Sequence, residues 1–207
     1  MSELHVLLVP DGADSGPWHW QQWLTARARE AGATVTRCPG PVEPAGWTAA
    51  LRAELAAVPP DAELAVVAHR GGARTWLRHA ADPGEDEVRR ADRVLLVAPA
   101  EPGVPGAGPD VPGEPDAPAL RAAGGPTRIV AGTEDPELSV CAAHALAHRL
   151  RVELDVLADG RGLDLAAGYG PWPALLRWAM YGSVPVADRF GTAPHVAGWS
   201  AVPEGAR

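Results

Sequence analysis

The sequence predicts a three-layer α/β/α sandwich with a mostly parallel central sheet. Short apolar runs alternate along the chain with longer helix-like segments, as in proteins whose parallel strands are joined by crossover helices. The run at residues 64–68 is apolar throughout, as expected of a strand buried on both faces. The length of 207 residues suits one domain with a core of its own.

The expected strands are short runs of apolar and β-branched residues, a composition that favours extended structure. In chain order they fall at residues 5–10, 34–38, 64–68, 93–98, 128–131 and 152–157. The segments between them carry helical patterns, and the one at residues 47–58 is rich in Ala and Leu. The helices are expected at residues 18–31, 47–58, 72–80, 139–150 and 173–180.

Two stretches break this alternation. Residues 99–126 are dense in Pro and Gly and have almost no large apolar side chain before Leu120. Such a long loop is functional or disordered, and its place after a strand makes it either a lid over a site or an insertion without a role. Residues 182–207 lack periodicity and are expected to form a tail that packs on the domain or is partly disordered. The α/β domain is therefore expected at residues 1–181.

Composition and charge exclude several classes of partner. The formal net charge of −8 and the pI near 5.3 argue against nucleic acid, because phosphate binding needs clustered Arg and Lys. The chain has no apolar run long enough to span a membrane and does not open on a signal-peptide pattern. We therefore expect a cytoplasmic protein without a membrane partner, and the sequence does not predict its oligomeric state.

The sequence also predicts no metal and no cofactor. Cys38 and Cys141 lack metal-type spacing, and His144 and His148 have no third ligand at a matching interval. All 18 basic residues are Arg, which excludes lysine Schiff-base chemistry and a phosphate-binding P-loop lysine. The absence of Lys, together with abundant Ala, Gly and Pro, is typical of a GC-rich bacterial genome.

Three segments together carry a resemblance to a known family. Residues 9–23 read VPDGADSGPWHWQQW, residues 66–72 read VVAHRGG, and GTEDP at residues 132–136 is followed by AAGYGPWP at residues 166–173. Their order and spacing resemble the YdeN-like family of small serine hydrolases, a compact branch of the α/β-hydrolase fold. The resemblance covers roughly residues 4–180 and implies that fold.

The resemblance also implies a changed catalytic triad. The family's elbow reads A-H-S-x-G with Ser as the nucleophile, and Arg70 stands at that place here. A guanidinium is always protonated and cannot attack a carbonyl. Asp135 matches the family's acid, whereas Gly162 falls where the family's His is expected. Asp11 replaces a Gly beside the oxyanion hole, where a carboxylate would repel developing negative charge. We therefore expect no serine hydrolase activity.

The candidate site residues come from these segments. We expect catalytic roles for Arg70, Asp135, His19 and Asp11, and substrate contacts from Trp18, Trp20, Ser15, His69, Gly71, Asp164 and Tyr169. Arg70 at a helix N-terminus would attract an anion or a polarised carbonyl oxygen. The structural alternative is that Arg70 pairs with Asp135 or Asp11 and only stabilises the fold.

Three functions remain open from the sequence. In the first, the protein is a non-hydrolytic enzyme of the cyclase, lyase or isomerase type, moving protons on a small organic molecule in bacterial specialised-metabolite biosynthesis. That substrate would carry a carboxylate or an enolisable carbonyl. In the second, it is an inactive pseudo-hydrolase that binds a ligand or a partner protein. In the third, Asp135 or His19 activates a water for hydrolysis, with Arg70 as the electrophilic group.

Overall fold

A single parallel sheet forms the centre of the protein. The computed structural model describes residues 3–11, 16–39, 46–82, 89–101, 114–158, 160–182 and 185–186. In this part of the chain six strands pair in the order β2-β1-β3-β4-β5-β6, and every neighbouring pair is parallel. The predicted parallel sheet is confirmed. The strands are β1 (Leu4–Val9), β2 (Thr34–Arg37), β3 (Glu63–His69), β4 (Arg93–Val97), β5 (Thr127–Gly132) and β6 (Glu153–Leu157).

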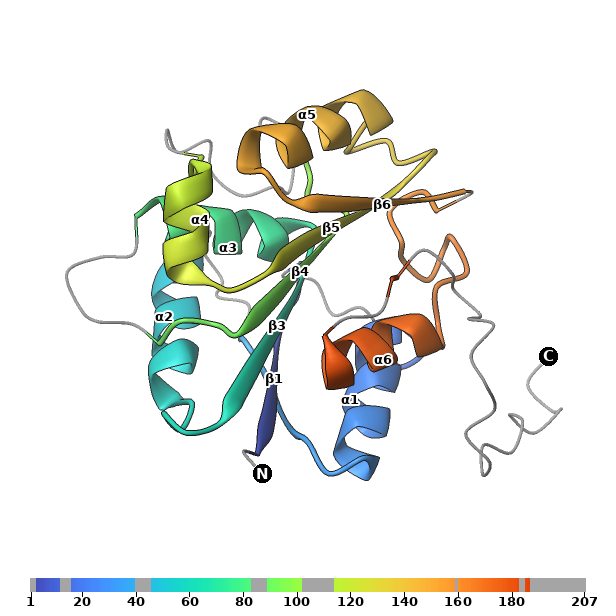
Figure 1. The fold of residues 1–207 in the computed structure, drawn as a ribbon. Helices are drawn as coiled ribbons and strands as arrows, with labels where there is room; N and C mark the ends of the chain where they lie inside the picture. The colour runs from blue at the N-terminus through green and yellow to red at the C-terminus, as the bar shows by residue number, and fades with distance from the viewer. Residues whose placement is uncertain are drawn as a thin grey trace, which may run out of the picture.

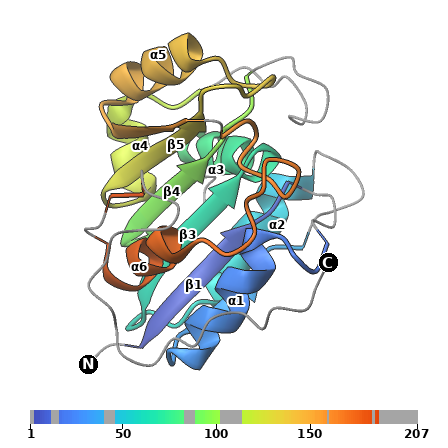
Figure 2. The ribbon, with the colours of Figure 1, turned by 90° about the vertical axis from the view of Figure 1, so that its right-hand side faces the viewer.

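Helices cover both faces of the sheet, which gives the predicted three layers (Figures 1 and 2). One face packs against α1 (Trp20–Glu30) and α6 (Pro173–Tyr181). The opposite face packs against four helices: α2 (Trp47–Ala57), α3 (Gly71–Ala81), α4 (Ala117–Ala123) and α5 (Val140–Leu150). Since each face has its own apolar cluster, the side chains of each strand alternate between two cores.

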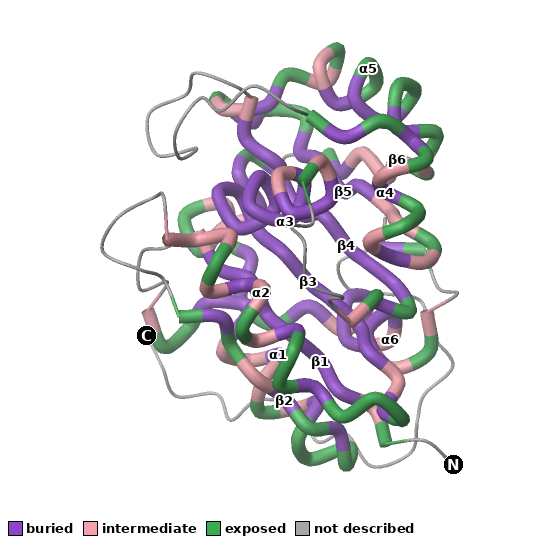
Figure 3. Tube along the Cα trace, turned by 90° about the vertical axis from the view of Figure 1, so that its left-hand side faces the viewer, coloured by how far each residue is buried: buried purple, intermediate pink, exposed green. Residues whose placement is uncertain are grey.

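The central strands are buried along nearly their whole length, as Figure 3 shows in purple. In β3, every residue after Glu63 is buried, and β4 is buried throughout. Burial on both faces explains why these strands read as continuous apolar runs rather than as alternating ones. The sequence prediction for the strand at residues 64–68 is therefore confirmed.

One helix departs from the sequence prediction. Residues 117–123 lie in the stretch expected to be a loop, yet they form α4. The side chain of Asp116 accepts a hydrogen bond from the amide of Ala119, and Pro118 lies in the first turn, where proline is tolerated. Leu120 is buried against the sheet and holds the helix in place. The helix therefore replaces the last part of the expected loop. Residues 102–113 of that prediction lie outside the described residues, as does most of the expected tail.

The carboxyl ends of the strands meet at one edge, where sites in such sheets lie. Asp11 lies just beyond β1, Arg70 follows β3, and Asp135 lies beyond β5. Gly72 lets α3 begin close to β1, because a Cβ at this position would lie 2.1 Å from the Val9 carbonyl oxygen. The fold therefore brings residues from three separate segments to one place.

Candidate functional site

Arg70 occupies a strained turn between β3 and α3. Its φ of 47° and ψ of −112° lie outside the regions that a non-glycine residue usually adopts. The amide of Arg70 donates to the Val97 carbonyl at 2.9 Å, which ties the turn to β4. The sharp strand-to-helix turn predicted from the sequence is present, and Arg70 is the residue at its apex.

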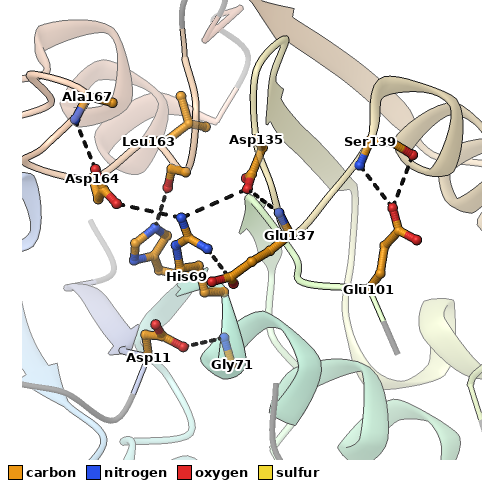
Figure 4. A network of polar contacts seen from close by, with 12 residues as sticks. Asp11, His69, Gly71, Glu101, Asp135, Glu137, Ser139, Leu163, Asp164 and Ala167 are labelled. Atoms are coloured by element: carbon orange, nitrogen blue, oxygen red, sulfur yellow. Dashed lines mark hydrogen bonds and ion pairs between the residues drawn. The ribbon is translucent and has the colours of Figure 1, made fainter. Parts of the chain in front are cut away.

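The guanidinium of Arg70 is surrounded by carboxylates (Figure 4). Its Nη2 lies 3.9 Å from Asp135 Oδ1 and 3.6 Å from Asp164 Oδ2, and its Nη1 pairs with Glu137. The Arg70 side chain is only 9% exposed, whereas those of Glu137 and Asp164 are 33% and 36% exposed. Arg70 is therefore an internal counter-ion, and the two more exposed carboxylates lie on its solvent side.

Gly162 makes room for this arrangement. A Cβ on Gly162 would lie 1.4 Å from Arg70 Nη2 and 2.4 Å from its Cζ. The guanidinium thus fills the space that a side chain at position 162 would need. The absence of a side chain at position 162 and the presence of Arg70 at the elbow are therefore linked by sterics.

Asp135 is buried, and within the described part of the chain one of its two carboxylate oxygens accepts a hydrogen bond while the other does not. Its side chain has no exposed area, and its Oδ1 accepts a hydrogen bond from the Glu137 amide at 2.9 Å. Its Oδ2 has no hydrogen-bond partner within the described residues. Burial raises the pKa of this carboxyl, although the Glu137 amide and the Arg70 charge oppose the rise. Asp135 is thus set deep in the site, behind the guanidinium.

Asp11 occupies the first amide of α3. Its Oδ1 accepts a hydrogen bond from the Gly71 amide at 2.8 Å. In an α/β-hydrolase the amide after the nucleophile is an oxyanion donor, so here a carboxylate of the protein takes the oxyanion's place. Burial raises the pKa of Asp11 to about 6, against the lowering effects of the Gly71 amide and Arg70. Asp11 is therefore a base with a pKa close to neutrality.

Two buried histidines lie beside the elbow. The ring centroids of His19 and His69 are 5.3 Å apart. His19 caps α1, with its Nδ1 accepting from the Gln21 amide at 3.3 Å, and burial lowers its pKa to about 4. His69 Nε2 donates to the Gly162 carbonyl at 3.0 Å, and burial lowers its pKa to about 3. Both rings are therefore neutral at pH 7, and His69 holds the loop that contains Gly162.

The low pKa of His69 predicts a loss of stability in acid. An unfolded His titrates near 6.5, so between that value and about 3 the unfolded state binds a proton that the folded state does not. The stabilising term is complete above pH 6.5 and decreases as the pH falls. His69→Gln keeps a donor for Gly162 but does not titrate. Urea unfolding should show that the wild type loses about 2 kcal/mol more than this variant between pH 7 and pH 4.5; parallel pH dependences would contradict the assignment.

The other predicted site residues are divided between the core and the surface. Trp20 is fully buried, its Nε1 donates to the Leu163 carbonyl at 2.8 Å, and Tyr169 packs on Trp172 with ring centroids 4.8 Å apart. Both rings are buried in the core, and the contact of Trp20 and Tyr169 with a substrate stays a prediction. Trp18 is 70% exposed, and its contact with a substrate stays a prediction. Ser15 lies outside the described residues.

Sequence reasoning missed Glu137. It lies two residues after Asp135 in the segment that follows β5, and it pairs with Arg70. A second acidic residue beyond the family's acid was the available signal. With Glu137 included, three carboxylates (Asp135, Glu137 and Asp164) pair with one guanidinium, and Asp11 lies near enough to feel its charge, so the site is rich in negative charge.

No metal-binding cluster is present among the described residues, since no group of at least three His, Cys, Asp or Glu side chains there could hold an ion. In the same part of the chain, no helix combines the length and the apolar character that crossing a bilayer requires.

Comparisons with known proteins agree with the fold. The model of the serine hydrolase family matches residues 6–179. A protein from Pectobacterium atrosepticum described as a YdeN-like hydrolase is 25% identical, with a TM-score of 0.64 over 88% of this chain and 94% of its own. The ydeN gene product of Bacillus subtilis is 16% identical, with a TM-score of 0.71; the match covers 87% of this chain and 97% of that protein.

Among the curated proteins no significant match was found. The family model spans the elbow of Arg70, the acid Asp135 and the loop of Gly162, and the solved structures share the arrangement of sheet and helices. This chain belongs to the serine hydrolase family and has the α/β-hydrolase fold, with Arg70 at the apex of its elbow.

Proposed function

We propose that this protein is a non-hydrolytic enzyme on a serine hydrolase fold, in which Asp11 acts as a general base on a small organic molecule. The observation that carries the proposal is a partly exposed carboxylate with a pKa of about 6, held on the Gly71 amide at the elbow. A general base is most effective when its pKa lies near the working pH. The reaction would be an isomerisation, elimination or cyclisation that starts with proton abstraction.

The geometry argues against the family's acyl-transfer route. Arg70 at the elbow cannot form an acyl-enzyme, and the Gly71 amide already donates to Asp11. His69 donates its Nε2–H to a backbone carbonyl and is held neutral by burial. The elbow therefore presents no nucleophile, and the Gly71 amide and the neighbouring His69 are both committed to other contacts.

The orientation of Asp11 suits proton transfer. The Gly71 amide fixes one carboxylate oxygen at 2.8 Å, and Oδ2 has no partner among the residues that the structure describes. A fixed carboxylate with one oxygen left over can accept a substrate proton without losing its own position. Arg70 lies close enough for its charge to lower the pKa of Asp11, which keeps part of the carboxylate ionised near neutral pH.

The charge of the site selects the substrate class. Four carboxylates around one guanidinium disfavour a substrate that carries its own carboxylate. Of the two substrate types expected from the sequence, a neutral molecule with an enolisable carbonyl therefore fits better. No cofactor enters the proposed reaction, because carboxylates are sufficient for proton abstraction next to a carbonyl.

The proposal is tested by hydrogen exchange. The protein is incubated in heavy water with a panel of β-diketones and β-keto esters, and loss of the α-proton is followed by NMR. Exchange should rise as the pH increases through about 6, because only ionised Asp11 accepts a proton. Asp11→Asn should lower the rate by at least about 10²-fold, since the amide keeps the contact with Gly71 but is not a base.

Glu30→Gln is the matched control, because it makes the same carboxylate-to-amide change on the exposed end of α1. Its exchange rate should equal that of the wild type. If Asp11→Asn exchanges as fast as the wild type, Asp11 is not the base.

Two other functions each have an observation in their favour. The pairing of Arg70 with three carboxylates fits a pseudo-hydrolase that binds a ligand without turnover, and such a protein would exchange no α-protons at any pH. Membership of a hydrolase family fits hydrolysis by a water activated at a carboxylate. That reaction would place one oxygen atom of isotopically labelled water in the product, whereas the proposed isomerase-type reaction would not.

A further inference from the structure

A cavity lies at the opposite edge of the sheet from Arg70. Its volume is about 460 Å³, within the range of small-molecule sites. The cavity is lined by the amino-terminal ends of β5 and β6 and the carboxyl-terminal ends of α4 and α5. Because all strands are parallel, this edge is separated by the full length of the sheet from the one that holds the candidate site. The cavity is independent of the proposed function.

Four arginines contribute to its wall: Arg90, Arg121, Arg128 and Arg151. Arg128 is neutralised, because its Nη1 donates to both carboxylate oxygens of Asp155 at 3.0 and 2.9 Å and its Nη2 pairs with Glu153. The other three have no carboxylate partner within the described part of the chain. Unpaired positive charge therefore gathers at one cavity of a chain whose formal net charge is −8.

Arg90 is held in place by backbone contacts. Its Nε donates to the Arg121 carbonyl at 3.1 Å and its Nη2 to the Gly124 carbonyl at 3.0 Å. These bonds fix the guanidinium without neutralising it, so little side-chain entropy remains to be lost when a ligand binds. Arg121 and Arg151 are exposed and free to close on an anion from either side.

The rest of the wall is largely apolar, apart from Thr127 and from Glu153, whose carboxylate pairs with Arg128. Leu120, Leu150 and Trp178 line the cavity behind the arginines. A guanidinium fork matches the two oxygens of a carboxylate or a phosphate, and an apolar wall favours a hydrocarbon body. The combination selects for a molecule that has both parts.

We propose that this cavity binds a small amphiphilic anion, with a carboxylate or phosphate head held by Arg90, Arg121 and Arg151 and a short hydrocarbon body against Leu120 and Trp178. The head group stays near solvent, where the exposed arginines can reach it. The body displaces water from the apolar wall.

Calorimetric titration of the full chain tests this proposal. Hexyl phosphate and hexanoate are the probes, and inorganic phosphate is the head group alone. At least one of the two amphiphiles should bind more tightly than inorganic phosphate. Comparing their affinities shows whether the cavity prefers a phosphate or a carboxylate head group. Arg121→Gln and Arg151→Gln should each weaken binding about tenfold, as expected for the loss of one charged contact.

Arg37→Gln is the matched control, since it removes the same charge from an exposed arginine on β2 that does not line the cavity. Its affinity should equal that of the wild type. The proposal is overturned if neither amphiphile binds, if inorganic phosphate binds as tightly as hexyl phosphate, or if Arg37→Gln weakens binding as much as Arg121→Gln.

Discussion

A variant that combines Asp11→Gly, Arg70→Ser and Gly162→His is expected to hydrolyse p-nitrophenyl acetate at least about 10³-fold faster than the wild type. The serine supplies a nucleophile at the strained elbow, and the histidine enters the space vacated by the guanidinium. Asp135 is already in place, with a buried Oδ2 that has no partner among the described residues. Removing the Asp11 carboxylate frees the Gly71 amide for an oxyanion.

The three changes are expected to act only together, because nucleophile, base and oxyanion donor work as a unit. Each single variant should stay at the wild-type rate, and adding Asp135→Asn to the triple variant should remove most of its gain. A fluorophosphonate should label position 70 of the triple variant and leave the wild type unlabelled. If Arg70→Ser alone hydrolysed the ester, a base other than position 162 would be present; labelling of Ser15 in the wild type would show another nucleophile.

Gly162→Ala is expected to lower the free energy of unfolding by about 3 kcal/mol, because a single methyl group displaces the Arg70 guanidinium. The new Cβ would lie 1.4 Å from Nη2, so the arginine must move. Among the described residues, Arg70 is the cation that pairs with Asp135, Glu137 and Asp164, so moving it leaves these carboxylates, one of which has no exposed area, without that partner. Breaking a buried ion pair from one side leaves a charge without compensation.

A double-mutant cycle with Arg70→Ser measures this coupling. In the Arg70→Ser background the space above position 162 is empty, and Gly162→Ala should then cost less than about 1 kcal/mol. Urea unfolding of the four proteins at pH 7 gives the coupling energy. Gly170→Ala is the matched control, because it adds a methyl group in the same loop at a position whose Cβ would meet the Trp18 carbonyl oxygen at 3.2 Å and not Arg70. Additive effects of the two changes would show that Arg70 does not fill the space at position 162.

Arg70 and Gly162 depend on each other, because the arginine side chain occupies the space beside the glycine. An arginine at the elbow needs a glycine at position 162, and the absence of a side chain there leaves space that the arginine fills. The two departures from the family pattern are thus coupled by sterics. The Asp11 carboxylate occupies the Gly71 amide beside them, and in the proposed function it is this carboxylate that acts as the base.

The sequence by itself determined the layers of the fold and the residues at the elbow. Apolar runs mark strands that are buried on both faces, and this local signal placed all six strands of the described sheet. The same signal missed α4, because Pro118 and the glycines around it are residues typical of a loop. The helix forms because Asp116 caps its first turn and Leu120 is buried. The replacement of the nucleophile by Arg70 was also visible, because the motif around it is local.

Only the tertiary structure decided what these residues do to one another. Asp11 and Gly71 are 60 positions apart, and their hydrogen bond exists because β1 and β3 end side by side. The same arrangement of strand ends places the Arg70 guanidinium over Gly162. There its charge is paired with Asp135, Glu137 and Asp164. The sequence gives the charge of a side chain but not its orientation. The orientation of the Arg70 guanidinium depends on the carboxylates around it and on the space left by the glycine at position 162.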